Sequence, residues 1–420
     1  DFAELATDDI VGSKTSNRLK RGDQTYTHMD NKNKKISCVD WQPKTKGVVA
    51  FAVVDPRTYE ERMQSYGKAQ SSYIVVWNFA DPIYPQVVLE APADVQCFKF
   101  NPHNQNIVVA GLINGQVAMW DLSSLNEGEK QLKWTHSSLI ELSHKESVND
   151  LQWILHKQMK NDRLVDNSPE TADQFATIGA DGKVIIWDIR IDNLKSSVKA
   201  GVRKNEKLKG AWIPYHTLSI FQIDGTSEVP GQSLFLCQEN PYHFACTSLE
   251  GDFMQADWTP SILSKNDDSQ ELEEEFSKKE KNIITFSSRI NPNAAHFGVA
   301  NHIDRHPIFN DFYLTTGDWS FKIWKQGGDY TTPILSSPYS DISSFVTCGK
   351  WSPTRPGVLY VGKSDGKLEV WDFLDKSHEP SMVFTINTQA SITSINFRVG
   401  TGASKFSVTI CAVGTSIGTL

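Results

Sequence analysis

Short apolar strands separated by tight turns recur along this chain, and the stretch Val346–Phe373 shows the repeating unit most clearly. Its first predicted strand ends at Trp351 before a Ser-Pro turn, and its second predicted strand is Gly357–Gly362. An Asp-Gly turn then leads into a third strand that ends in Trp371 and Asp372. Short strands joined by tight turns, with Trp-Asp closing the last of them, are typical of one blade of a β-propeller.

The same unit recurs with regular spacing. From the turn proline to the tryptophan that closes the third strand, the distance is 18 residues for Pro102–Trp120 and Pro353–Trp371, and 17 for Pro241–Trp258 and Pro307–Trp324. Closing tryptophans stand at positions 77, 120, 187, 258, 324 and 371. The shortest gaps between them, 43 and 47 residues, are close to the roughly 40–45 residues of one blade. The longer gaps contain polar inserts.

The pattern therefore predicts an all-β fold, a seven-bladed WD-repeat β-propeller with loop inserts, over residues 36–420. The last blade stops before its third strand is complete. Residues 1–35 are predicted to be an N-terminal linker, in which a short strand near Gln24–His28 would complete the last blade and close the ring. The inserts Asp55–Ser72, Leu155–Asp173 and the charged run Lys265–Lys281 are predicted surface loops. Since the chain does not begin with Met and ends within a strand pattern, we expect it to be part of a longer protein.

Composition narrows the possible functions. The chain has 42 Lys and Arg against 50 Asp and Glu, a net charge of −8, so we expect no nucleic-acid partner. No apolar run approaches the roughly 18–20 residues that a membrane-spanning helix needs, so we expect no membrane partner. Six cysteines are scattered, mostly within predicted strands and without CxxC spacing. We interpret them as small buried hydrophobic residues in a reducing compartment, not as zinc ligands or disulfides.

One stretch matches a phosphate-binding motif by its letters alone. Gly357–Ser364 fits the pattern GxxxxGK[ST]. That motif binds phosphate through a glycine-rich loop that leads into a helix N-terminus. Here the four middle residues are Val-Leu-Tyr-Val, which is a strand pattern, and an Asp-Gly turn follows. We therefore reject nucleotide binding at this stretch.

No other pattern indicates catalysis or a metal site. His302 and His306 are four residues apart, but no helical pattern surrounds them, and the neighbouring Asp304 and Pro307 indicate a loop. The sequence contains no GxSxG, no HExxH and no Cys/His group with ligand spacing. We expect a protein that is not an enzyme and that holds no cofactor and no metal.

Two residues are candidates for partner binding. The other blades place Gly at the second position of the turn between their second and third strands, whereas blade five has Asp318 and Trp319. An exposed tryptophan at the rim of the ring is a candidate interface hot spot; the alternative is that it folds over its own blade. Arg355 lies in the loop between the first two strands of blade six, on the opposite face of the ring, where it would bind a carboxylate or stay solvated.

Two of these blades resemble a known family. The stretch Phe312–Trp324 resembles the "LT-GDW-x-x-x-IW" signature of dynein intermediate chains. Trp351–Val358, followed by the Asp-Gly turn and Trp371–His378, looks like the next blade of the same family. The resemblance covers roughly residues 36–420. Within the family, the axonemal inner-arm branch, which includes an intermediate chain of the two-headed inner-arm dynein, is the most similar. The segments that indicate this branch are Ser72–Trp77, Asp81–Glu90, Ala110–Val117 and Val413–Thr419.

The resemblance implies a non-catalytic subunit of an axonemal inner-arm dynein in the cilium or flagellum. Such a propeller binds the tail of a dynein heavy chain and pairs with a second intermediate chain. Light chains bind an N-terminal extension in this family, and no residue of this chain can be assigned to that role. Two alternatives remain open: a peptide-reading WD-repeat adaptor outside dynein, and an outer-arm or cytoplasmic dynein intermediate chain.

Overall fold

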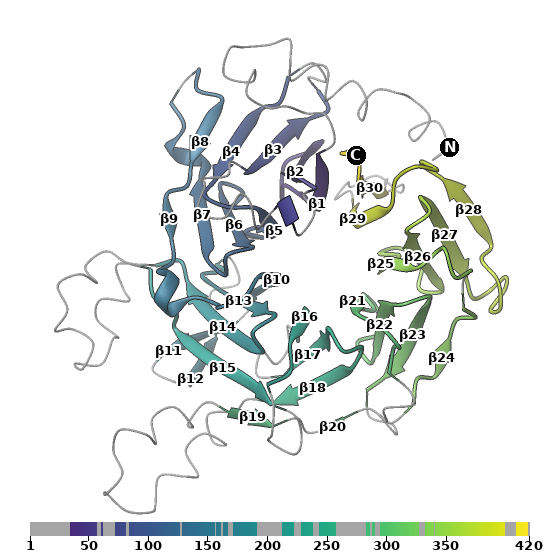
Figure 1. Ribbon diagram of the computed structural model, residues 1–420. Coiled ribbons are helices and arrows are strands. Elements are labelled where there is room, and N and C mark those ends of the chain that lie inside the picture. The colour runs from purple at the N-terminus through teal and green to yellow at the C-terminus, as the bar shows by residue number, and fades with distance from the viewer. Residues whose placement is uncertain are drawn as a thin grey trace, which may run out of the picture.

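The computed structural model is an all-β ring of sheets (Figure 1), and it confirms the predicted fold class. The structure describes residues 34–418 apart from the segments 57–59, 62–71, 81–83, 127, 156, 161–162, 167–170, 191–211, 222–227, 238–242, 258–282, 286–287, 290–294, 327–331, 340 and 400–408. The predicted strand near Gln24–His28 and the charged run Lys265–Lys281 lie outside the described residues. So does most of the insert Asp55–Ser72.

Seven of the sheets in the described residues follow one another in chain order, and each of these corresponds to one predicted blade. Blade one comprises β1 (Lys35–Trp41), β2 (Val48–Val54), β3 (Ser72–Asn78) and β4 (Val87–Ala91). Blade two comprises β5 (Val95–Phe100), β6 (Ile107–Leu112), β7 (Val117–Asp121) and β9 (His136–Ser137). Blade three comprises β10 (Val148–Ile154), β13 (Gln174–Gly179), β14 (Lys183–Asp188) and β15 (His216–Phe221).

The second half of the chain repeats this arrangement. Blade four comprises β16 (Gly231–Leu236), β17 (His243–Ser248), β18 (Phe253–Asp257) and β20 (Ser288–Arg289). Blade five comprises β21 (Ala300–Arg305), β22 (Phe312–Gly317), β23 (Ser320–Lys325) and β24 (Leu335–Ser336). Blade six comprises β25 (Val346–Trp351), β26 (Val358–Lys363), β27 (Lys367–Asp372) and β28 (Met382–Thr385). In blade seven the structure describes β29 (Ile392–Val399) and β30 (Thr409–Thr415).

Three features differ from the sequence prediction. Six blades have a fourth, outer strand beyond the three that were predicted. The sequence did not reveal these strands, because none ends in a closing Trp-Asp and three of them have only two residues. Two sheets are extended by a parallel strand, β8 (Gln131–Lys133) on blade one and β19 (Ile283–Thr285) on blade three. Part of the predicted loop Leu155–Asp173 is a hairpin of β11 (Lys157–Lys160) and β12 (Arg163–Asp166).

The core lies between the faces of neighbouring blades. Each blade is apolar on both faces, so the apolar clusters join residues of adjacent sheets, as for Phe98 of blade two against Ala50 of blade one. The five closing tryptophans within the described residues are buried among these clusters, which confirms that they are core residues; Trp120 and Trp187 are fully buried. The sixth, at position 258, lies outside the described residues. A large buried indole needs an acceptor for its N–H, and the carbonyl oxygen of Glu90 provides one for Trp120 at 3.0 Å.

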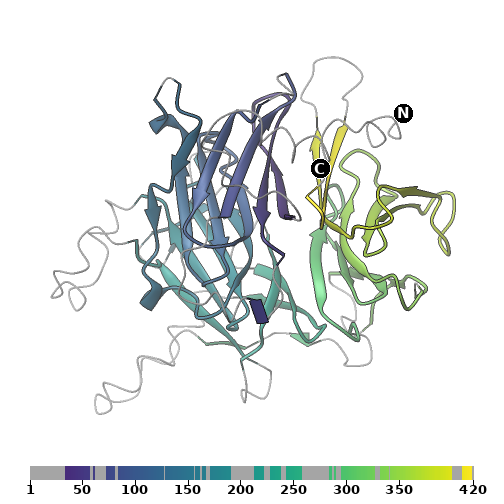
Figure 2. The same cartoon turned by 45° about the horizontal axis from the view of Figure 1, so that its top comes forward.

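Blade seven packs against blade one, so the two ends of the described chain meet; Figure 2 shows the last sheet standing between blades six and one. Asn396 of blade seven makes most of the polar contacts at this junction. Its side-chain Nδ2 donates to Val39 O at 3.1 Å and to Asp40 Oδ1 at 2.9 Å. Its backbone carbonyl oxygen accepts from Trp41 Nε1 at 3.3 Å. Asp40 Oδ2 in turn accepts the Phe100 N–H of blade two at 2.8 Å. One carboxyl group therefore joins three successive blades.

Burial raises the pKa of Asp40 to about 6, because the loss of hydration outweighs the hydrogen bonds that it accepts from Phe100 and Asn396. In the unfolded chain the carboxyl group titrates at its ordinary value of 3.8. The folded state therefore binds the proton more tightly, and the free energy of unfolding falls as pH rises from about 4 to about 6.

We predict that Asp40→Asn removes this fall in the free energy of unfolding between about pH 4 and pH 6. Measured by urea unfolding between pH 4 and pH 7, wild type becomes less stable relative to the variant as pH rises. The asparagine also alters the bond to Asn396, but that cost shifts the whole curve equally at every pH. Parallel curves for the two proteins over this range would contradict the assignment.

Candidate partner-binding surface

The turn between β22 and β23 differs from the corresponding turns of the other blades. It is a two-residue hairpin in which Gly317 pairs with Ser320, whereas the turn of blade six has one residue more and ends in Gly366 at φ 76°. In blade five the left-handed residue is Asp318, at φ 43°. The shorter turn moves the left-handed position from a glycine to the aspartate, so Trp319 takes an ordinary backbone conformation.

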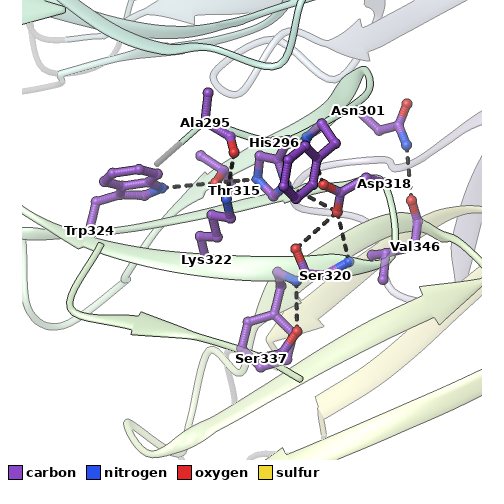
Figure 3. A network of polar contacts seen from close by, with 12 residues as sticks. Ala295, His296, Asn301, Thr315, Asp318, Ser320, Lys322, Trp324, Ser337 and Val346 are labelled. Atoms are coloured by element: carbon purple, nitrogen blue, oxygen red, sulfur yellow. Dashed lines mark hydrogen bonds and ion pairs between the residues drawn. The ribbon is translucent and has the colours of Figure 1, made fainter. Parts of the chain in front are cut away.

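The Asp318 carboxylate stabilises this strained turn by accepting several hydrogen bonds (Figure 3). Oδ1 accepts from Ser320 N at 2.8 Å and from Ser320 Oγ at 2.9 Å, and Oδ2 accepts from Phe297 N at 2.9 Å. The backbone carbonyl of Asp318 accepts from Val346 N of blade six at 2.8 Å. The turn is therefore attached both to the segment that precedes β21 and to the next blade.

A buried chain of polar groups continues from Asp318 into the blade. His296 Nδ1 lies 3.4 Å from Asp318 Oδ1, and His296 Nε2 lies 2.9 Å from Thr315 Oγ1. Thr315 Oγ1 also accepts from Trp324 Nε1 at 2.9 Å. Since the ionised Asp318 carboxylate can only accept, His296 carries a proton on Nδ1 toward it, and the Nε2 of a neutral imidazole accepts the threonine O–H.

The protonation states agree with this assignment. Burial lowers the pKa of His296, so the imidazole is neutral at pH 7. Burial opposes ionisation of Asp318, but the bonds from His296 and from the backbone outweigh it and hold the pKa of Asp318 at about 2. Lys322 lies beside this chain, where its Nζ donates to Ala295 O at 2.7 Å, and burial lowers the pKa of Lys322. The arrangement orders the turn and offers no activated nucleophile.

Blade three contains a second copy of this chain. His144 Nδ1 lies 2.8 Å from Asp181 Oδ1, His144 Nε2 lies 2.9 Å from Thr177 Oγ1, and Trp187 Nε1 donates to the same oxygen at 3.0 Å. The sequence patterns did not reveal either copy. The available signal was a threonine ten or nine residues before the closing tryptophan, with an aspartate in the turn and a histidine before the first strand.

Trp319 lies half-buried on this turn, and its Nε1 donates to Ile342 O, at 3.0 Å, in the connection between β24 and β25. Exposed apolar residues surround it. Phe297 is 77% exposed, Tyr339 61% and Ile342 90%, and the rings of Phe297 and Tyr339 lie 6.1 Å apart. We call the following set the blade-five patch: Phe297, Val299, Trp319, Tyr339, Ile342 and Phe345. Clustered exposed apolar residues of this kind mark interaction sites.

Arg355 does not join this patch. It is exposed in the loop between β25 and β26, at the end of the ring opposite to the β22–β23 turn. The neighbouring loop of blade five contacts the β25–β26 loop at Pro356, because His306 Nε2 donates to Pro356 O at 2.8 Å. The exposed side chains of Ile308 and Phe309 lie in that loop. The two predicted partner-binding residues are therefore on opposite faces, as the strand order implied.

The structure corrects the expectation of a loop at His302 and explains both histidines. His302 belongs to β21, and burial lowers its pKa well below the ordinary value. His306 Nδ1 accepts the N–H groups of Ile308 and Phe309 at 3.1 and 2.8 Å, so this histidine shapes its loop. Among the residues that the structure describes, no group of three His, Cys, Asp or Glu side chains could hold a metal ion.

The false phosphate motif and the cysteines also have structural explanations. The stretch Gly357–Ser364 contains strand β26, and Lys363 pairs with Glu369 of β27, so the motif has no loop-to-helix context. All six cysteines are free, and burial raises the pKa of Cys246 to about 12.

Within the described ranges, no helix is long and apolar enough to cross a membrane.

Comparison with known proteins gives one matching family. The model of the dynein axonemal intermediate chain 3 WD40 domain matches residues 18–138 and 231–420. Dynein axonemal intermediate chain 3 of Homo sapiens is 28% identical over 91% of this chain and 51% of its own length, and that of Danio rerio is 28% identical over 96% and 47%. The flagellar outer-arm 70 kDa intermediate chain of Chlamydomonas reinhardtii is 26% identical over 86% and 52%. The chain thus spans about half the length of these curated relatives.

The polar chain beneath Trp319 gives a stability prediction with a neighbouring control. Thr315→Val leaves the Trp324 N–H and His296 without their shared partner and should cost about 1–3 kcal/mol of unfolding free energy. The adjacent Thr316 is also buried, but its Oγ1 has no hydrogen-bond partner. Thr316→Val should therefore be neutral or slightly stabilising.

The check is the urea-unfolding midpoint of the two variants and wild type, measured side by side. Equal midpoints for the two variants would show that the polar chain does not stabilise blade five.

Proposed function

The chain belongs to the family of dynein axonemal intermediate chain 3 WD40 domains, and from that premise we propose that it is a non-catalytic scaffold subunit of an axonemal dynein, in the inner-arm class. Its relatives are axonemal, ciliary and flagellar dynein intermediate chains, which indicates the axoneme as its location. The family match over 311 of 420 residues, from the ranges 18–138 and 231–420, is the observation on which this proposal rests. The inner-arm assignment rests on the resemblance of blades one, two and seven to that branch.

A ring of packed sheets suits a scaffold role. Its blades are joined by buried apolar faces and by polar contacts such as those of Asn396 and Asp318, so its two rims present surfaces at fixed angles. A rigid surface of this kind loses little conformational entropy when a partner binds. The motor's ATP hydrolysis would reside in another subunit.

We assign the blade-five patch to the tail of a dynein heavy chain. The patch combines a half-buried tryptophan, which is an enriched hot-spot residue type, with more exposed apolar neighbours that would exclude water around it. The fixed turn beneath Trp319 holds the indole in place before the partner arrives. Arg355, on the opposite face, is proposed to contact a carboxylate of another subunit and not the heavy-chain tail.

Two further partners belong to this proposal. A second intermediate chain would share the heavy-chain tail, since one ring with two rims can contact a tail and a neighbouring subunit at once. Light chains would bind an N-terminal extension of the kind this family carries, and no residue of this chain is assigned to that role. No surface of the ring is assigned to them.

We predict that Trp319→Ala weakens heavy-chain binding about tenfold or more, the loss expected for an interface hot spot. The measurement is affinity purification of the tagged full-length protein from ciliated cells at moderate salt, with quantitative mass spectrometry of the bound chains. Leu374→Ala is the matched control, because Leu374 is a 90% exposed apolar residue in the connection after β27, on the opposite face.

The outcomes separate the parts of the proposal. Inner-arm heavy chains and a second intermediate chain with wild type and the Leu374 variant, but not with the Trp319 variant, support all of it. Heavy chains of another dynein class retain the family and overturn the inner-arm assignment. Wild-type protein that recovers no heavy chain overturns the scaffold role and favours a peptide-reading adaptor.

A further inference from the structure

The outer edges of the blades are protected in different ways, and the longest outer strands are covered. The outer strand of blade one, β4, has five residues, and that of blade three, β15, has six. Each pairs in parallel with a three-residue strand that comes from the following blade, β8 on β4 and β19 on β15. An uncovered edge strand exposes unpaired N–H and C=O groups, which other chains can bind. This chain supplies its own covering strand in both places.

Three other outer strands need no cover because they are very short. The outer strands of blades two, four and five, β9, β20 and β24, have two residues each. A very short edge strand is a common protection against pairing with other chains. Blade six differs from all of these. Its outer strand β28 has four residues, and no strand of the described chain pairs with its outer edge.

The exposed side chains of β28 are apolar. Met382 is 60% exposed and Val383 is 48% exposed, and they point to opposite faces of the strand. The hydrogen bond from Ile386 N–H to Gly366 O, at 3.0 Å, shows which residues of this segment direct their N–H groups toward β27: Ile386 and every second residue before it. Because bonding direction alternates along a strand, Val383 and Thr385 direct their N–H and C=O groups away from β27. The edge is thus long enough to pair, apolar and open.

We propose that β28 binds an extended segment of another subunit of the dynein complex, which adds to blade six as a fifth strand. That the partner is a dynein subunit rests on the proposed function. The open edge of β28 is independent of that proposal. The chain's own covering strand β8 shows what such a segment requires. Its central residue Leu132, between Gln131 and Lys133, packs against the apolar core of blades one and two. A segment with apolar residues at alternate positions would likewise cover the exposed apolar side chain on one face of β28, either Met382 or Val383.

The test compares amide hydrogen exchange of the peptide covering residues 381–386 in two samples. One is the isolated full-length protein, and the other is the native complex purified through that protein. Backbone pairing at the edge should slow exchange of the Val383 and Thr385 amides about tenfold or more in the complex. The peptide covering β24 serves as the internal reference, because the outer edge of this two-residue strand is too short to pair with an added strand.

A pair of proline variants tests the same edge by a second route. Val383→Pro removes an outward N–H and leaves the pairing with β27 intact, since proline is tolerated at edge positions of this kind. Ser336→Pro is the matched control, because the bond from Ser337 N–H to Phe321 O directs the Ser336 N–H outward from β24. Val383→Pro should abolish the exchange protection in the complex, and Ser336→Pro should leave it unchanged.

Several results would overturn the proposal. A complex that forms normally while residues 381–386 exchange as fast as in the isolated protein excludes an added strand. Protection already present in the isolated monomer assigns the edge to another part of this chain, and protection that appears with a dimer mass assigns it to a second copy. If no complex can be purified at all, the proposed function fails, which is a different outcome from an unprotected edge.

Discussion

The structure depends on one constraint: every blade has two apolar faces, and only neighbouring blades can cover both. A single twisted sheet of this kind cannot fold alone, so the sheets must follow one another around a common centre until the last one meets the first. The contact between blades seven and one is therefore as important as any sheet hydrogen bond. Asn396 and Asp40 meet there, and the enclosed carboxyl group makes that contact sensitive to pH. The same constraint explains why the inserts Asp55–Ser72 and Leu155–Asp173 occur in connections between strands of one blade, β2 and β3 or β10 and β13, where they do not interrupt the packing of the faces.

Much of the fold could be predicted from the sequence because its signals are local. Alternating apolar residues, Gly-containing turns and the closing tryptophans gave the three inner strands of most blades within a few residues of the observed bounds. Short outer strands such as β9 and β24 could not be predicted, because each consists of two residues whose pairing depends on the neighbouring strand. The parallel strands β8 and β19 were hidden for the same reason, since each is defined by an edge supplied by another blade.

The candidate site was predictable only in part. The sequence singled out Trp319 because it occupies a turn where other blades have glycine. It did not show that the turn is one residue shorter, that Asp318 takes the left-handed conformation, or that Thr315 and His296 hold it. Those features depend on residues brought together from separate strands. The apolar neighbours come from two connections, Phe297 from the one before β21 and Tyr339 and Ile342 from the one between β24 and β25, so the patch exists only in the folded ring. The rejection of the phosphate motif, by contrast, needed only the strand pattern of its middle residues.

We propose that this ring is a scaffold of an axonemal dynein and that its blade-five patch contacts the heavy-chain tail. A cryo-electron microscopy map of the complex isolated from axonemes tests it most directly. We expect continuous heavy-chain density over Phe297, Trp319 and Ile342 on the rim formed by the β22–β23 turn. A map in which the heavy chain contacts only the opposite rim, around Arg355 and Leu374, and leaves Trp319 facing solvent would contradict it.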